Sequence, residues 1–381
     1  MKLFSVLVNR ANYARLFPVL KIMQEDLEID NYLILSGTTL LDEYGNFSDE
    51  NFLDQFHILQ KIPCEDGGRS LVSMACTTAN AIRSFSEFLT QNKPDMLLLI
   101  GDRYETLGVA IAASYLNIKI AHVQGGELSG SIDENIRHCI TKLSHLHFPA
   151  TEQARRNIIQ MGENPQYVIR TGCPCGDYIL NRETAYTLDI LNRVQVNVDF
   201  DLQEEFILVS YHPVTTRIDE ESKNITTLIE VVFEFGVNII WTYPNSDPGS
   251  NAIRAALNQY KSLHNKVLKC SFITNIAPEE YLELINSASV CLGNSSSFVR
   301  DSSFLGTPVV LVGDRQTNRE IAHNVVNVPI EHNSLMTALQ YQYNHIRYAS
   351  SKLYGDGSAS EKIVKAIKDF TGSHIKTFCK S

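Results

Sequence analysis

Short, continuous apolar segments alternate with longer helical patterns along this 381-residue chain, and this alternation restricts the fold more than any other feature. Apolar runs such as Met96–Ile100 and Phe206–Tyr211 end abruptly at glycine or polar residues, as buried parallel strands do where they pass into loops. Leu71–Gln91 carries a long helical pattern between such runs. Strands and helices that alternate in this way form parallel sheets through right-handed crossovers. The sequence therefore predicts an α/β protein with doubly wound sheets.

The alternation of strands and helices occurs twice. The predicted strands of the first half are Leu3–Val8, Tyr32–Ser36, Met96–Ile100, Ile118–Val123 and Leu146–Pro149. Those of the second half are Phe206–Tyr211, Val237–Tyr243, Val290–Leu292 and Pro308–Val312, the last clear strand. We therefore expect two Rossmann-like domains that face each other across a cleft, one over residues 1–175 and one over 176–359. The C-terminal helix, within 360–381, is expected to complete the first domain.

Composition and charge exclude several classes of protein. The formal net charge of −10 argues against general nucleic-acid binding, and no apolar run approaches the roughly 20 residues that span a bilayer. The eight cysteines include no CxxC pair, so we interpret them as reduced, packed thiols of a cytoplasmic protein. No residues have a defensible metal-ligand spacing, so no metal site is expected.

Charged and polar side chains follow the predicted strands, where open α/β sheets bind ligands. Asp102 and Arg103 directly follow the run that ends at Ile100, while Gln124 and Asp133 follow the next predicted strand. Asp102 and Asp133 are candidates for a general acid and a general base acting on one substrate. The alternative is that both carboxylates cap helices or pair with nearby arginines.

The segment GNSSS at 293–297 ends a predicted strand and opens a helix. Backbone N–H groups at a helix N-terminus and small hydroxyls form a phosphate cradle, although serines are also common as plain helix caps. Three arginines at strand ends could engage a diphosphate through their guanidinium forks, namely Arg10, Arg103 and Arg315. Asp301 could accept from a ribose diol or be a surface charge of the helix. His212 could carry a proton, donate to a phosphate or be purely structural.

Several long motifs together resemble one known family. GDRYE, HVQGGELSGSIDENIRHCITKLSH, YHPVTT, GNSSSFVRD, GTPVVLVGDRQTNRE and KLYGDG occur in the order and spacing of UDP-N-acetylglucosamine 2-epimerases. The similarity extends over nearly the whole chain. It is closest to the hydrolysing branch, whose members release UDP and N-acetylmannosamine for sialic-acid synthesis.

The resemblance implies a glycosyltransferase-B type fold with a nucleotide-sugar in the cleft, no metal or redox cofactor, and a homodimer or homotetramer. It implies that the diphosphate region is held by Arg10, Arg103, Ser295, Ser296 and Arg315. It implies that Asp301 binds ribose and that backbone groups of Ile276 meet uracil. The sugar would be surrounded by Asp102, Gln124, Asp133 and His212. The implied reaction is loss of UDP from C1 with removal of the C2 proton, followed by addition of water to the glycal and return of a proton to the opposite face.

Gln124 departs from the family pattern, since hydrolysing members carry a catalytic glutamate there and an amide cannot exchange protons as a carboxylate does. Three interpretations follow. Asp102 or Asp133 could be the base, with Glu127 as a substitute near the substrate. The substrate could differ, for example a 2,4-diacetamido-trideoxyhexose linked to UDP or GDP on the legionaminic-acid route. The protein could also bind a nucleotide-sugar without turnover. A non-hydrolysing 2-epimerase and a glycosyltransferase are further alternatives.

Overall fold

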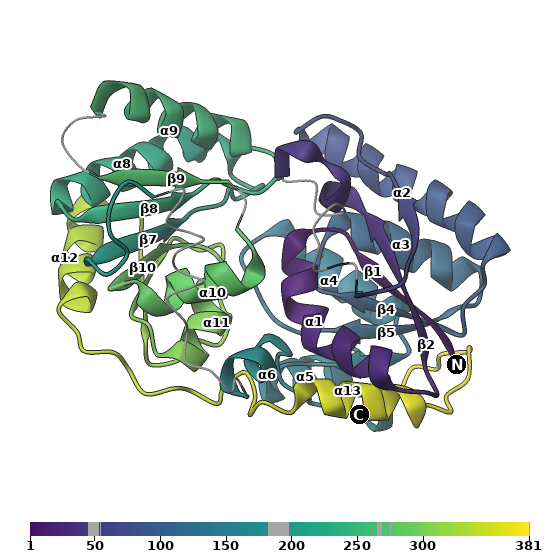
Figure 1. Ribbon diagram of the computed structural model, residues 1–381. Coiled ribbons are helices and arrows are strands. Elements are labelled where there is room, and N and C mark those ends of the chain that lie inside the picture. The colour runs from purple at the N-terminus through teal and green to yellow at the C-terminus, as the bar shows by residue number, and fades with distance from the viewer. Residues whose placement is uncertain (45–52, 54, 182–197, 265–268, 275, 381) are drawn as a thin grey trace.

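The computed structural model describes the chain except for residues 45–52, 54, 182–197, 265–268, 275 and 381, and it contains two parallel six-stranded sheets (Figure 1). The strand order is β3-β2-β1-β4-β5-β6 in the first sheet and β12-β11-β10-β7-β8-β9 in the second. Counted from its own first strand, each sheet follows the 3-2-1-4-5-6 order of a Rossmann fold. The predicted pair of doubly wound α/β units is therefore confirmed.

The first lobe, which we define as the unit built on the first sheet, follows the predicted alternation closely. Its elements are β1 (Lys2–Leu7), α1 (Arg10–Glu25), β2 (Asp30–Ser36), β3 (Ile58–Ile62), α2 (Leu71–Gln91), β4 (Met96–Ile100), α3 (Tyr104–Tyr115), β5 (Lys119–Val123), α4 (Ile132–Leu143), β6 (Leu146–Phe148) and α5 (Glu152–Gln160). Short 3-10 turns at Gly37–Leu40 and Asp42–Tyr44 follow β2. All five residues of β4 are buried, which explains its continuous apolar sequence.

The second lobe is built on the second sheet. Its elements are β7 (Phe206–Ser210), α8 (Glu221–Phe235), β8 (Asn238–Thr242), α9 (Ser250–His264), β9 (Cys270–Ile273), α10 (Pro278–Ser287), β10 (Val290–Gly293), α11 (Ser297–Leu305), β11 (Val309–Val312), β12 (Val325–Val328) and α12 (His332–Tyr343). The interpretation of residues 308–312 as the last strand was wrong, because β12 follows and pairs with β11. β12 is an edge strand with only one fully buried residue, so its sequence lacks a continuous apolar run.

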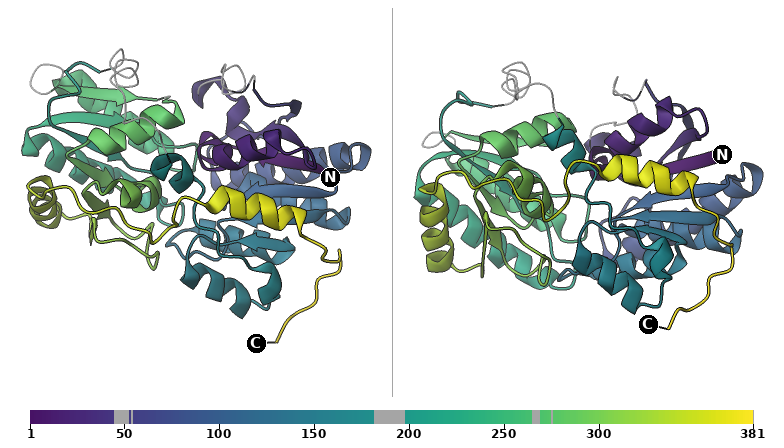
Figure 2. Two further views of the ribbon diagram at one scale, coloured as in Figure 1. Left: turned by 60° about the horizontal axis from the view of Figure 1, so that its bottom comes forward. Right: turned by 90° about the horizontal axis from the view of Figure 1, so that it is seen from below.

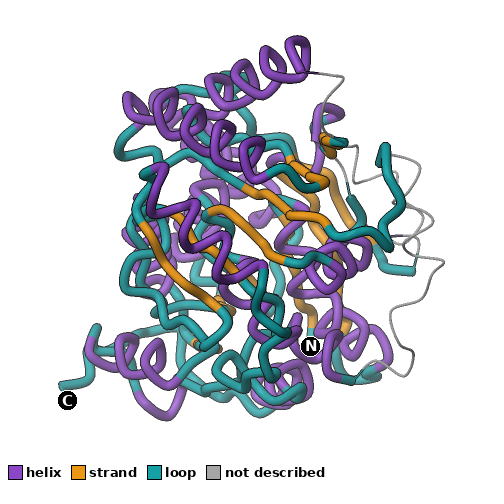
Figure 3. The backbone as a smooth tube through the Cα atoms, turned by 90° about the vertical axis from the view of Figure 1, so that its left-hand side faces the viewer, coloured by secondary structure: helices purple, strands orange, loops and turns teal. Residues whose placement is uncertain are grey.

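Helices cover both faces of each sheet (Figure 3). In the first lobe, apolar residues of α1 pack on one face, while α2, α3 and α4 pack on the other. In the second lobe, α10 and α11 pack on one face, while α8, α9 and α12 pack on the other. Alternate residues of the central strands point into the two cores, as the strand period of two requires. Each lobe is therefore a three-layer sandwich.

The chain returns to the first lobe at its C-terminal end (Figure 2). α13 (Ala359–Lys368) places Ile363, Val364 and Ile367 in the same core as the apolar residues of α1. Much earlier in the chain, α6 (Cys175–Leu180) lies where the chain leaves the first lobe. This packing supports a first domain of residues 1–175 completed by the C-terminal helix, and we keep these boundaries as a proposal.

Candidate active site

A cavity of about 330 Å³ lies between the two lobes. It is lined by residues that follow β1, β4 and β5 of the first sheet and by residues that follow β7, β8, β9, β10 and β11 of the second. The carboxyl edges of both sheets therefore meet at the cavity. Both topological switch points, between β1 and β4 and between β7 and β10, open into it, and such switch points are the preferred ligand sites of doubly wound sheets.

The residues that we singled out from the sequence are mostly brought together here. Those that line the cavity are Arg10, Asp102, Arg103, Gln124, Asp133, His212, Ile276, Ser295, Ser296, Asp301 and Arg315. Their convergence from seven strand ends is what a shared ligand site requires.

Glu127 does not line this cavity. Its carboxylate is 5% exposed and pairs with the guanidinium groups of Arg300 and Arg319, while Arg137 donates to its backbone oxygen. Burial alone would raise the pKa of Glu127, but the charges of Arg300 and Arg319 hold it below its usual value. Glu127 therefore contacts basic residues of both lobes, and its expected contact with substrate stays a prediction.

The serine corner, which we define as Ser295, Ser296 and Ser297, joins β10 to α11. Ser296 occupies the N-cap position of α11, and the hydroxyls of Ser295 and Ser297 are 2.8 Å apart. Arg15 on α1 of the opposite lobe donates to the Ser296 hydroxyl at 3.3 Å. The corner therefore combines a helix N-terminus, hydroxyls and a cation, which are the features that bind a phosphate group.

A second contact between the lobes also involves α1, through its first residue. The Arg10 guanidinium donates to the backbone oxygen of Ile276 at 3.2 Å. Asn9 caps α1 by accepting from the backbone N–H of Asn12 at 2.8 Å, and this cap sets the direction of the first turn that carries Arg10.

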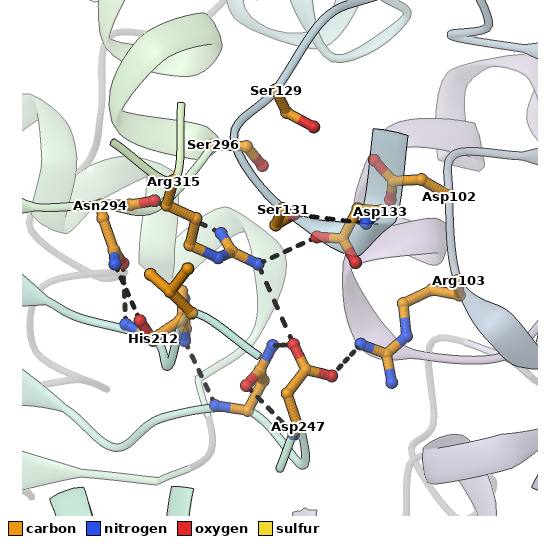
Figure 4. Close-up of polar contacts among 12 residues, drawn as sticks. Asp102, Arg103, Ser129, Ser131, Asp133, His212, Asp247, Asn294, Ser296 and Arg315 are labelled. Carbon is orange, nitrogen blue, oxygen red and sulfur yellow. Dashed lines mark hydrogen bonds and ion pairs between the residues drawn. The ribbon is translucent and has the colours of Figure 1, made fainter. Parts of the chain in front are cut away.

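Asp102 and Asp133 line the same cavity and lie near one another (Figure 4). Asp102 is bound by the buried Arg137 guanidinium. Burial alone would raise the pKa of Asp102, but the charge and the hydrogen bond of Arg137 lower this pKa below its usual value. Burial and the charge of Asp102 raise the pKa of Asp133, against the opposing charge of Arg315. The surroundings thus lower the pKa of Asp102 and raise the pKa of Asp133.

His212 follows β7 and is held by its neighbours. Its Nδ1 accepts from the backbone N–H of Asn245 at 3.2 Å, so the neutral ring carries its proton on Nε2. Burial, followed by the charge of Arg315, lowers the pKa of His212 to about 3. The ring is therefore a neutral hydrogen-bond donor at physiological pH.

Alternating charges cross the cavity from one lobe to the other (Figure 4). Arg103 of the first lobe donates to Asp247 of the second at 2.5 Å. The Arg315 guanidinium lies 4.0 Å from Asp247 and 3.5 Å from Asp133 of the first lobe. Arg103 and Arg315, two of the three arginines that the sequence suggested for a diphosphate, are thus paired with protein carboxylates.

Sequence reasoning missed Asp247 and Arg137. The segment PNSDPGS at 244–250 comes after the predicted strand Val237–Tyr243, and its polar residues follow β8 in the same way that GDR follows β4. Arg137 lies within a long helix, and nothing in its spacing reveals that it reaches Asp102. Position after a strand could have identified Asp247, whereas Arg137 required the fold.

The described residues contain no cluster of His, Cys, Asp or Glu side chains arranged to hold a metal ion. Among the helices of the described chain, none combines the length and the apolar character needed to cross a membrane.

Comparison with known proteins identifies relatives over nearly the full length. Residues 21–368 match the family described as UDP-N-acetylglucosamine 2-epimerase. A hydrolysing UDP-N,N'-diacetylbacillosamine 2-epimerase of Legionella pneumophila is 35% identical over 96% of this chain and 95% of its own. A hydrolysing GDP/UDP-N,N'-diacetylbacillosamine 2-epimerase of Campylobacter jejuni is 31% identical over 86% of this chain and 84% of its own. The structure of a UDP-GlcNAc 2-epimerase of Methanocaldococcus jannaschii, in complex with UDP-GlcNAc and UDP, superimposes with a TM-score of 0.80 at 21% identity, over 97% of this chain and 100% of that one.

Proposed function

The chain belongs to the UDP-N-acetylglucosamine 2-epimerase family, and we propose that it is a hydrolysing 2-epimerase acting on a UDP-linked 2-acetamido sugar. The observation that carries this proposal is the convergence of two carboxyl groups, a neutral histidine and a serine corner on one cavity between the lobes. The hydrolysing mode is further supported by the relatives at 35% and 31% identity, whose names include it.

For the substrate we propose UDP-N,N'-diacetylbacillosamine, because both of these relatives are named for this sugar. UDP-N-acetylglucosamine is the second candidate, because the matched family is described by it. A GDP-linked form of the first sugar is a variant of the same proposal.

The diphosphate would lie between the serine corner and the arginines of both lobes. Developing charge on the departing UDP is stabilised best by donors already fixed in place. The N-terminus of α11, Arg15 and Arg315 have this character, and Arg10 and Arg103 approach from the first lobe. Asp301 would accept from the ribose, and backbone groups near Ile276 would meet uracil. His212 would donate from Nε2 to a phosphate or sugar oxygen.

Asp102 and Asp133 would carry the protons. Carboxyl groups whose environments move their pKa values apart divide acid and base work between them. Asp102, with its lowered pKa, is ionised and would remove the C2 proton as UDP leaves C1. Asp133, with its raised pKa, would return a proton to the opposite face of C2 as water adds at C1. The sum is nucleotide-sugar plus water giving UDP and the free 2-epimer.

The activity is tested by incubating the purified protein with UDP-N,N'-diacetylbacillosamine and with UDP-N-acetylglucosamine. Free UDP together with a 2-epimerised free sugar is the expected result, with faster turnover of the first substrate. A 2-epimer still linked to UDP would establish the non-hydrolysing alternative. Tight binding without any product would establish a nucleotide-sugar-binding protein, and both outcomes would overturn the proposal.

The proton assignment is tested with Asp102→Asn and Asp133→Asn in D₂O. Asp102→Asn should lower the release of UDP by about 10²–10⁴-fold, the usual contribution of a general base. Asp133→Asn should still release UDP but accumulate the unsaturated glycal, because the return of the proton is lost. The reverse pattern would contradict the assignment.

We also propose that the protein works in the cytoplasm as a homodimer or homotetramer. All eight cysteines are free thiols, which suits a reducing compartment. Light scattering coupled to size-exclusion chromatography measures the assembly directly, and a single 42.8 kDa species would contradict it.

A further inference from the structure

Gln124 has a fixed position directly after β5. Its backbone adopts a left-handed conformation with φ of 63°, and its N–H donates to the backbone oxygen of Phe148 at 2.9 Å. Only 2% of the residue is exposed, yet it lines the cavity between the lobes. Its amide nitrogen Nε2 donates to the sulfur of Cys173 at 2.8 Å. A buried amide whose NH₂ group is hydrogen-bonded to the protein holds its carbonyl oxygen in a defined direction.

A chain of hydrogen bonds continues from this amide into the second lobe. The Sγ atoms of Cys173 and Cys175 are 3.1 Å apart, and the Cys175 thiol donates to Oδ1 of Asp301 at 3.0 Å. Cys173 and Cys175 are 1% and 3% exposed. We call these two thiols and the Asp301 carboxylate the thiol relay.

The carboxylate determines the direction of the thiol relay. A carboxylate accepts hydrogen bonds, so the single proton of Cys175 is used toward Asp301. Cys175 therefore accepts from Cys173, whose own single proton is used in that bond. Cys173 can then only accept from Gln124, so the amide must turn its NH₂ group toward the sulfur.

The carbonyl oxygen of the Gln124 amide is consequently directed away from the sulfur. The only side-chain hydrogen bond of Gln124 among the described residues is the one from Nε2 to Cys173, so Oε1, which has two acceptor sites, is left for a group in the cavity. If the amide were reversed, its oxygen would face the lone pairs of Cys173. Both atoms would then be acceptors, and no hydrogen bond could form between them.

We propose that the thiol relay is a positioning device that fixes the Gln124 amide, so that its Oε1 accepts a hydrogen bond from an N–H or O–H group of the sugar. Gln124 then recognises the substrate, and the proton transfers belong to other groups. This inference rests on the proposed function, because it requires a sugar in the cavity. The acetamido N–H is the donor expected in a 2-acetamido sugar.

The backbone around the thiols supports a fixed geometry. Cys173 N–H donates to the backbone oxygen of Tyr354 at 2.6 Å, and its own backbone oxygen accepts from Gly176 at 2.9 Å. Pro174 between the two cysteines restricts the backbone further. The sulfur atoms are therefore positioned by the hydrogen-bonded backbone at the entry into α6.

The test is a double-mutant cycle on the full-length protein. Cys173→Ala should raise KM for the 2-acetamido sugar nucleotide about tenfold with a smaller change in kcat, because substrate recognition is lost. Cys173→Ser keeps a donor and an acceptor and should restore KM to within about threefold. Cys64→Ala, at a thiol that is 2% exposed and outside the cavity, should leave both constants unchanged.

The same Cys173→Ala change, made in a Gln124→Ala background, should have little further effect, because residues acting as a unit are not additive. An equal tenfold rise in KM in both backgrounds would overturn the inference and show that Cys173 is only a packing residue.

Calorimetry separates this inference from the proposed function. If the unaltered protein binds a UDP-sugar more tightly than UDP without turnover, only the proposed reaction fails, and the cycle is read from Kd. If it binds UDP-sugars no more tightly than UDP, Gln124 does not contact a sugar and the inference is overturned.

Discussion

Glu65 shows how one side chain can make the stability of the whole protein depend on pH. It lies near Glu105, which is fully buried and forms two hydrogen bonds with Arg103 at 3.0 and 3.1 Å. Burial and then the charge of Glu105 raise the pKa of Glu65 to about 7, against the opposing charge of Arg103. The folded protein therefore holds a proton on Glu65 at a pH where the unfolded chain has lost it.

The expected consequence is a fall in stability as the pH rises from about 4.5 to about 7, with no further change from this group above that range. Glu65→Gln removes the ionisation and should raise the free energy of unfolding at pH 8 by roughly 1–3 kcal/mol, with little change at pH 4.5. Urea denaturation across this pH range measures the effect. Glu87→Gln, at an exposed position on α2, is the control. A parallel shift at every pH would contradict the explanation.

The residues of the cavity were predictable from sequence only where their chemistry follows from position. Asp102 and Ser295 directly follow β4 and β10, so their placement at the sheet edge follows from the alternation alone. The pairing of Arg103 with Asp247 depends on how two lobes dock, and no spacing along the chain encodes that docking. The thiols of Cys173 and Cys175 were interpreted as packing groups. The hydrogen bond between Cys173 and the Gln124 amide could not be predicted, because the two residues are 49 positions apart in the sequence.

At the scale of secondary structure, the central strands were predicted better than the edges. β1, β4 and β7 lie inside their sheets, and their sequences are mostly apolar. β3, β9 and β12 are edge strands that the sequence did not reveal, and each contains half-exposed or exposed residues. An edge strand has a neighbour on one side only and is less buried, so its composition resembles that of a loop.

α13 depends on a cap supplied from a distant part of the chain. The Asp177 carboxylate accepts from the backbone N–H groups of Ala359 at 3.0 Å and Ser360 at 2.5 Å. Asp177→Ala should therefore lower the free energy of unfolding by about 1–2 kcal/mol, the usual cost of losing a helix cap. Asp177→Asn keeps one acceptor and should cost less. Denaturant titration measures both, and equal stability of all three proteins would show that the cap contributes nothing.

At the scale of the molecule, charges hold the lobes together without ligand. Asp247 lies between Arg103 and Arg315, and its removal leaves two cations facing each other across the cavity. Asp247→Asn should therefore lower the Tm of the free protein, because one partner of a buried ion pair is lost. It should also increase the rise in Tm that UDP produces, since the diphosphate then neutralises both arginines.

Thermal unfolding with and without UDP provides the measurement for Asp247→Asn. Asp219→Asn, at an exposed acid of the same lobe, should leave both values unchanged. If UDP raised the Tm of the Asp247 variant by less than that of the unaltered protein, Asp247 would instead be a residue that helps to bind the nucleotide.

Each lobe repeats the same strand order and contributes its own switch point to the cavity. On the proposed assignment, the nucleotide is bound mainly by the C-terminal half of the protein and the hexose mainly by the N-terminal half. Selection can then alter the loops after β1, β4 and β5 to accept a new monosaccharide while the UDP-reading half stays unchanged. Diversification among such enzymes should accordingly concentrate in the N-terminal half, and chimeras that exchange it should inherit the sugar preference of its donor.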